Sequence, residues 1–141
     1  MITIRKIIAG KQSGAQRAAL DFAEHHNIEH GGVDSRLAHA DHDEPSNNTH
    51  RNVDDSDATL IVLPAHVESR ATQATIAYWD DFMKPYLVTD GRNQESLMRW
   101  FDSMEELHPN LILNVTGPRH GESVKTYDLT YEVLSSILTA S

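Results

Sequence analysis

Cysteine is absent from this 141-residue chain. Its absence excludes disulfides, thiolate nucleophiles and cysteine-built zinc or iron–sulfur sites, and it fits a cytoplasmic protein. The sequence also lacks the run of ~18 apolar residues that a bilayer-spanning helix needs. The opening segment MITIRKIIAG is interrupted by Arg5 and Lys6 and has no cleavage-site pattern, so we expect no signal peptide. The sequence therefore predicts a cytoplasmic protein without a membrane partner.

Positive charge is scarce in this chain. Twelve Lys and Arg residues against 21 Asp and Glu residues give a formal net charge of −9. Such a chain repels a phosphate backbone, which argues against a nucleic-acid partner but leaves room for a small basic pocket. Apolar residues make up 39% of the sequence. That share is enough for the core of one domain spanning residues 1–141.

Two periodicities of apolar residues alternate along the chain. Strand-type runs and helical stripes stand, in turn, near residues 4–8, 15–26, 58–63, 71–83, 86–88, 93–107, 111–115 and 124–138. Residues 28–49 carry few apolar side chains and many Gly, Asp, Asn and His residues, so we predict a long polar loop there. The alternation predicts an α/β fold. We expect one Rossmann-like, doubly wound domain whose mainly parallel sheet has helices on both faces.

Ligands of such folds bind beyond the carboxyl ends of the strands. The first predicted strand runs into GKQSGAQR, whose candidate ligand-binding residues are Gly10, Lys11, Gln12, Ser13, Gly14 and Arg17. Glycines bring backbone N–H groups close to a ligand, and a helix with Ser13 as its N-cap presents unpaired donors and partial positive charge. An ordinary strand–turn–helix junction has the same residues, so this segment alone leaves both interpretations open.

Two further segments are expected to leave strand carboxyl ends. Residues 49–57 contribute the candidates Arg51, Asn52, Ser56 and Asp57. Caps and surface ion pairs would use the same side chains. Residues 114–123 contribute the candidates Gly117, Pro118 and Arg119. The guanidinium of Arg119 can donate two parallel hydrogen bonds to an oxyanion, while a simple tight turn remains the alternative.

Metal and nucleophilic chemistry find little support. The chain has nine histidines, and His39 and His42 stand three residues apart, but nothing around them fixes a ligand geometry. We therefore expect no metal site. Neither a Ser-His-Asp order nor a GxSxG elbow is visible, so nucleophilic catalysis is not predicted.

Several segments, taken in order, resemble one family over roughly residues 4–138. The segments are GKQSGAQRAALDFA, THRNVDDSDATLIV, ATQAT, KPYLV and LNVTGPR. They resemble the putative molybdenum carrier family of the Rossmann-like SLOG superfamily, which also includes cytokinin-activating nucleotide hydrolases. The resemblance implies a divergent member that binds a small anion, either a nucleotide phosphate or a molybdenum cofactor or molybdate-like oxyanion. It also implies that the chain forms a homo-oligomer.

The chain departs from the family's pattern at three positions near the expected site. Lys11 replaces a loop glycine, Asn48 stands where the family has arginine, and Arg70 stands where the family begins Gly-Gly-Thr. A side chain in place of a glycine adds a Cβ atom, and Lys11 and Arg70 add positive charge. Either these cations replace backbone contacts to the anion, or they fill the pocket. The sequence leaves both alternatives open.

The leading interpretation is a non-catalytic binding protein. Its anion would be bound by the three segments and by the hydroxyl of Thr72. One alternative is a phosphoribohydrolase-like enzyme, with Glu122 or Asp57 as the carboxylate near the ribose. The glycine-rich loops of those hydrolases are missing here, which disfavours this reading. The other alternative is an interaction protein with a degenerate pocket, whose oligomer surface would carry Tyr78, Trp79, Phe82 and Trp100.

Overall fold

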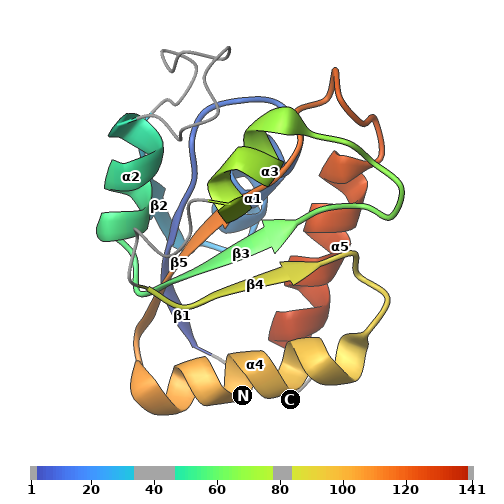
Figure 1. The fold of residues 1–141 in the computed structure, drawn as a ribbon. Helices are drawn as coiled ribbons and strands as arrows, with labels where there is room; N and C mark the ends of the chain where they lie inside the picture. The colour runs from blue at the N-terminus through green and yellow to red at the C-terminus, as the bar shows by residue number, and fades with distance from the viewer. Residues whose placement is uncertain (1–2, 34–46, 78–83, 140–141) are drawn as a thin grey trace.

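The computed structural model describes residues 3–33, 47–77 and 84–139 of the chain (Figure 1). Strands and helices alternate through these residues. In chain order they are β1 (Ile4–Ile8), α1 (Ala15–His25), β2 (Glu29–Gly31), α2 (Asn47–Asp54), β3 (Ala58–Val62), α3 (Arg70–Ala77), β4 (Tyr86–Thr89), α4 (Gln94–Leu107), β5 (Leu111–Thr116) and α5 (Thr126–Thr139).

The five strands form one parallel sheet in the order β2-β1-β5-β3-β4. The last strand in sequence, β5, therefore lies in the middle, between β1 and β3 (Figure 1). This arrangement confirms the predicted Rossmann-like α/β fold. Because all strands are parallel, their carboxyl ends meet at one edge of the sheet, and the loops after β1, β3 and β5 leave it side by side.

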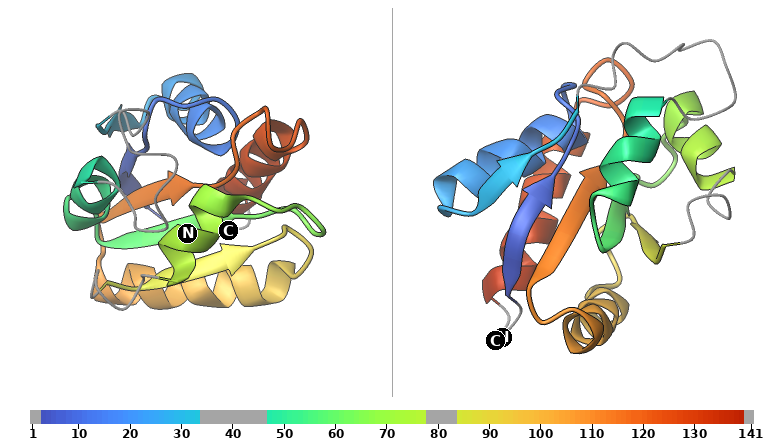
Figure 2. Two further views of the ribbon diagram at one scale, coloured as in Figure 1. Left: turned by 45° about the horizontal axis from the view of Figure 1, so that its top comes forward. Right: turned by 90° about the vertical axis from the view of Figure 1, so that its left-hand side faces the viewer.

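Helices cover both faces of the sheet. Figure 2 shows α2 and α3 on the opposite side from α1 and α5. The main core lies between the sheet and α1, α4 and α5, and its largest fully buried side chains include Phe22, Leu60, Leu97, Phe101, Leu113, Leu134 and Ile137. The other face holds a small cluster of Val53, Ile61 and Ile76. On the same face, two polar side chains are buried as a pair: Asn114 Nδ2 donates to Thr59 Oγ1 at 3.1 Å.

Two elements were not predicted. The segment 28–49 was expected to be a polar loop, but β2 occupies Glu29–Gly31 and α2 begins at Asn47; residues 34–46 lie outside the described part of the chain. Strand β2 is too short to show alternation. Helix α2 is polar, and contacts from outside hold it: Lys84 Nζ donates to the backbone oxygens of Asp54 and Ser56 at its end, both at 2.6 Å. Tertiary contacts of this kind leave no local pattern.

The structure corrects where two of the predicted helices begin. Helix α1 begins after Gly14, and Gly14 is its N-cap in place of the predicted Ser13. Val124 was expected on the last helix, but it precedes α5 and is 66% exposed. Trp100 packs its ring edge-on against Phe101, with the ring centres 4.9 Å apart, beside the core. The predicted helix of residues 71–83 is described only as far as residue 77. Residues 78–83, which include the expected oligomer-surface residues Tyr78, Trp79 and Phe82, lie outside the described residues. Within the described ranges, none of the helices has the length and apolar character to cross a bilayer.

Candidate functional site

The loops after β1 and β5 touch at the carboxyl edge of the sheet. We call residues Gly10–Gly14 and Gly117–Arg119 together the loop junction. Ala15 N donates to Pro118 O at 3.2 Å, and His120 N donates to Ser13 Oγ at 3.1 Å. Gly14 has φ 78°, and a Cβ atom there would stand 2.3 Å from Pro118 O. The side-by-side placement expected for these two segments is therefore present, and it depends on a glycine at position 14.

A second glycine brings the β3 end of the sheet into the same cluster. A Cβ atom on Gly117 would stand 2.3 Å from Val62 O and 2.9 Å from the Cβ atom of Ala15. The turn after β5 thus lies against both the end of β3 and the start of α1. Gly117 and Pro118 are buried and shape this packing.

A buried glutamine braces the junction from inside. Gln16 is 8% exposed, its Oε1 accepts from Gln12 N at 3.0 Å, and its Nε2 lies 3.4 Å from Thr116 Oγ1. Gln12 was expected to contact the ligand, but its N–H is committed to this bond. Gln16, which sequence reasoning passed over, is the residue that ties the loop after β1 to the end of β5.

Several N–H groups at the junction face no protein acceptor. The N–H of Ala15 donates to Pro118 O, and the first bond inside α1 runs from Ala18 N to Gly14 O at 3.0 Å. Within the described residues, the N–H groups of Lys11, Ser13 and Gly14 have no hydrogen-bond acceptor. These three donors lie in the loop that leads into α1, with Gly14 as the N-cap, and the first turn of that helix contains no acidic residue. This local field suits negative charge.

Two arginines add positive charge at the same edge. Arg17 lies in the first turn of α1, three residues after Gly14, and Gly14 packs on the backbone of Arg119. Arg17 Nη1 stands 4.0 Å from Asp21 Oδ1, and Arg119 Nε stands 3.6 Å from Glu122 Oε1. Half of each arginine side chain is exposed. Exposed pairs of this kind contribute about 0–1 kcal/mol, so an anion can draw either guanidinium away at little cost. Lys11 is exposed beside them.

Glu122, the first carboxylate proposed for catalysis, is used within its own loop. Its Oε1 accepts from Arg119 N at 3.1 Å, and its N–H donates to Arg119 O at 2.9 Å. These bonds form a closed turn around Arg119. The carboxylate therefore sets the conformation of the turn that carries the arginine.

Ser56 and Asp57 are placed at the wrong edge for the expected site, which corrects the sequence interpretation. Residues 49–57 precede β3, so Ser56 and Asp57 lie at the amino edge of the sheet, opposite the loop junction. Asp57 Oδ2 accepts from Ile112 N at 2.9 Å, and Ser56 Oγ donates to Val53 O at 2.8 Å. The Asp57 side chain holds the start of β5, and the Ser56 side chain bonds to the last turn of α2. The same placement puts Asp57, the second carboxylate of the catalytic alternative, at the edge opposite the loop junction.

Helix α2 carries the other two candidates of this segment. Asn52 is 5% exposed, and it fixes the chain after β2 by accepting from Val33 N at 2.8 Å and donating to Val33 O at 3.0 Å. Arg51 is exposed and stands 3.9 Å from Asp55. Asn52 thus joins α2 to the chain after β2. Arg51 is in a surface pair, as the alternative interpretation had it.

Thr72 lies in the first turn of α3, beyond β3, with 4% exposure. Its Oγ1 accepts from Ser69 Oγ at 2.8 Å, and Ser69 Oγ in turn lies 3.3 Å from Thr72 N. The hydroxyl expected to meet a ligand therefore closes the first turn of its helix. The side chains of Asn48 and Arg70 lie outside the described part of the structure.

Residues 34–138 match the circularly permutated YpsA SLOG family. The chain belongs to this SLOG family. A crystal structure of a putative molybdenum carrier protein from Syntrophus aciditrophicus SB superposes with a TM-score of 0.78 at 30% sequence identity, covering 97% of this chain and 96% of that chain. No curated protein matches the chain. The two matches confirm the suspected family and point to a ligand-binding or related function.

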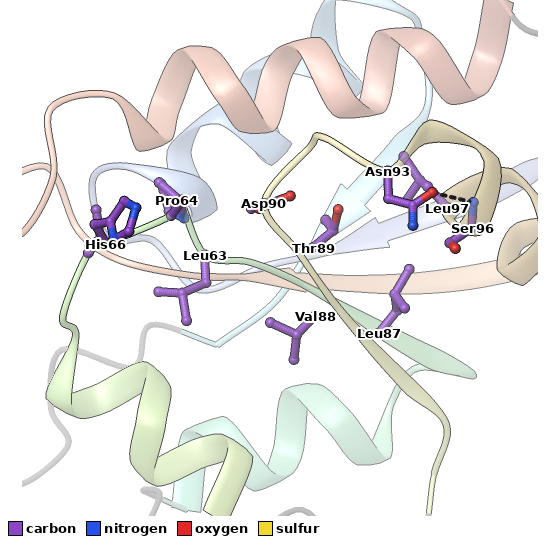
Figure 3. A pocket seen from close by; sticks show the side chains of 12 residues that line it. Leu63, Pro64, His66, Leu87, Val88, Thr89, Asp90, Asn93, Ser96 and Leu97 are labelled. Atoms are coloured by element: carbon purple, nitrogen blue, oxygen red, sulfur yellow. Dashed lines mark hydrogen bonds between the residues drawn. The ribbon is translucent and has the colours of Figure 1, made fainter.

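A cleft of about 490 Å³ opens at the same edge of this SLOG chain, beyond the ends of β3 and β4. Figure 3 shows its wall, formed by the loop with Pro64 and His66 on one side and the loop with Asp90 and Asn93 on the other. Sequence reasoning missed these residues, although LPAH and TDGRN both follow strands and the carboxyl-end rule applied to them as well. In the ranges that the structure describes, histidine and acidic side chains do not gather into a group of three that could hold a metal.

A pair of glycine substitutions tests the junction. Gly14→Ala should destabilise the protein by about 2–4 kcal/mol, because alanine meets both the positive φ and the carbonyl of Pro118. Gly121→Ala is the matched control, since a Cβ atom there meets nothing within 4 Å. Urea unfolding measures both variants. Equal stability of the two would contradict the close contact.

Tyr127 gives a pH-dependent test of the seam between α1 and α5. Its hydroxyl donates to Asp21 Oδ2 at 2.6 Å, and this bond, with burial and the charge of Asp21, raises the pKa of Tyr127 from 10.0 to about 12. Because the folded-state pKa is raised, the stabilisation is complete below pH 10 and is lost as the pH rises toward 12.

The variant Tyr127→Phe should be about 1 kcal/mol less stable than the wild type at pH 8. The difference should shrink between pH 10 and pH 12, as urea unfolding at several pH values would show. A difference that stays constant to pH 12 would show that the hydroxyl bond to Asp21 is not its source.

Proposed function

We propose that this chain is a non-catalytic binding protein for a small anion, held at the loop junction. The candidate ligands are a nucleotide phosphate and a molybdenum cofactor or molybdate-like oxyanion. The observation that carries the proposal is the set of donors at one point: the N–H groups of Lys11, Ser13 and Gly14, without acceptors among the described residues, next to Arg119. The name of the structural relative from Syntrophus aciditrophicus agrees with such a ligand.

The chain's own charge explains why this arrangement suits binding. The protein carries a formal charge of −9, so an anion approaches it against a repulsive field unless cations are concentrated locally. Lys11, Arg17 and Arg119 supply that concentration at the carboxyl edge. An anion at the junction would accept from the backbone donors, and the two arginines would turn from Asp21 and Glu122 toward it. Charge-assisted hydrogen bonds of this type are stronger than neutral ones.

We also propose that the protein forms a homo-oligomer and is cytoplasmic. The family resemblance favours a homo-oligomer, and the lack of cysteine favours the cytoplasm. Light scattering of the purified protein measures its mass, and a mass of one chain would rule out the oligomer.

Calorimetric titration tests the binding directly. We expect saturable binding of at least one of AMP, inorganic phosphate, molybdate and tungstate at low ionic strength. Arg119→Gln should weaken that binding about tenfold, because it removes a charge-assisted donor. Arg99→Gln, an exposed arginine on α4, removes the same charge away from the junction and should leave binding unchanged. No binding of any of the four at millimolar concentration would refute the proposal, as would a gain of binding in Lys11→Gly, which would show a pocket filled by its own lysine.

Absence of catalysis is a separate expectation. Nucleoside monophosphates incubated with the protein should release no free base, because Glu122 is held in its own turn. Chromatography of the mixture measures the base. Release of base by the wild type and its loss in Glu122→Gln would make the chain an enzyme.

A further inference from the structure

Three side chains link the loop junction to the contact between α1 and α5. Both helices begin at the carboxyl edge, lie on the same face of the sheet (Figure 2) and pack against each other. Arg17 lies in the first turn of α1, and Asp21 follows one turn later on the same helix. Tyr127 is the second residue of α5, and its hydroxyl reaches Asp21. The three side chains therefore form a row that begins beside the junction.

The carboxylate of Asp21 is shared unequally between the other two. Its Oδ2 accepts from the Tyr127 hydroxyl at 2.6 Å, the length of a strong bond to an ionised acceptor. Its Oδ1 stands 4.0 Å from Arg17 Nη1, which is too far for a hydrogen bond. A base four residues before an acid on a helix is also the weaker order for an ion pair. Asp21 is therefore bound firmly to the tyrosine and loosely to the arginine.

Arg17 is thereby kept beside the junction without being captured. Within the described residues its guanidinium has no other partner, and half of the side chain is exposed. Arg119 is held in a similar way. Its Nε stands 3.6 Å from Glu122 Oε1, and that oxygen accepts its shorter bond, at 3.1 Å, from Arg119 N. At both arginines the nearby carboxylate makes its shorter hydrogen bond with a different donor.

The tyrosine hydroxyl limits how strongly Asp21 can compete for Arg17. Without that hydroxyl, both oxygens of the carboxylate would be open to the guanidinium. Arginine offers two parallel donors that match a carboxylate, and such a pair is stronger than one long contact. An anion at the junction would then have to break the pair before it could bind Arg17. The bond from Tyr127 to Asp21 therefore favours release of the arginine.

We infer that Tyr127 is a positioning residue for anion binding, because its hydroxyl occupies Asp21 and so keeps Arg17 available to the anion. This inference rests on the anion site proposed above, and it adds a residue that acts without contacting the anion. The bond to Asp21, together with burial, raises the pKa of Tyr127 to about 12. The hydroxyl therefore keeps its proton, and with it its role as a donor, at neutral pH.

A double-mutant cycle between Tyr127 and Asp21 tests the inference. The probes are AMP, inorganic phosphate, molybdate and tungstate, titrated by calorimetry at neutral pH and low ionic strength. Tyr127→Phe should bind the anion that the wild type binds about threefold more weakly. Asp21→Asn should bind it about threefold more tightly, because the competing charge is gone. Since Tyr127 acts through that charge, the double variant should bind like Asp21→Asn alone.

Tyr131→Phe is the matched control. Tyr131 lies one turn further along α5, and its ring stacks on that of Tyr127 with the centres 6.4 Å apart. Its hydroxyl lies 2.7 Å from His25 Nδ1, so this variant removes a hydroxyl from the same helix contact without touching Asp21. It should bind the anion like the wild type. An equal loss of affinity in Tyr131→Phe, or a loss from Tyr127→Phe that persists in the Asp21→Asn background, would show a merely structural role and overturn the inference.

The outcomes separate this inference from the proposed function. Anion binding by the wild type with unchanged affinity in Tyr127→Phe would overturn the inference and leave the anion site standing. No binding of any of the four anions by the wild type would refute both. If Tyr127→Phe fails to fold, as urea unfolding would show, Asp21→Asn still decides. An unchanged affinity in that variant would contradict the competition for Arg17.

Discussion

The close approach of two backbones at the carboxyl edge is the constraint on which the site depends. Because β5 lies between β1 and β3, the loops that leave these strands must share one small space. Gly14 packs on the carbonyl of Pro118, and Gly117 packs on the carbonyl of Val62. A side chain at either position would push the loops apart. The loop junction is therefore a property of the strand order, and its donors and arginines follow from it.

The carboxyl edge is divided by charge. At the loop junction, just before α1, the N–H groups of Lys11, Ser13 and Gly14 have no acceptor among the described residues and lie near Arg17 and Arg119. The lining of the cleft beyond β3 and β4 carries Asp90 and neither lysine nor arginine. The two regions are close in the fold, since Gly117 touches Val62 and the next residue, Leu63, lines the cleft. One edge of a parallel sheet thus carries two regions that differ in charge.

The sequence predicts the parts of this fold that local patterns encode. The stripe of Ala15, Ala18, Ala19, Phe22 and Ala23 gives α1 almost to the residue, and β-branched runs give the central strands. Helix α2 was not predicted, because contacts with distant residues stabilise it: its Asn52 bonds to Val33, and Lys84 donates to the backbone oxygen of Asp54. The sequence interpretation placed Asp57 at the carboxyl edge of the sheet. Asp57 comes before β3, and it therefore lies at the amino edge. Thr72, Gln12 and Glu122 were predicted as ligand-binding or catalytic candidates. The hydrogen bonds that they make within the protein leave no pattern in the sequence.

Backbone amide shifts during an anion titration test the central claim most directly. With inorganic phosphate or molybdate added to isotopically labelled protein, we predict that the largest changes fall on the amides of Lys11, Ser13 and Gly14, with smaller ones at Arg119. Shifts of Ser56 and Asp57, at the opposite edge, should stay near zero. Changes spread over the surface, or none at these three N–H groups, would contradict the account.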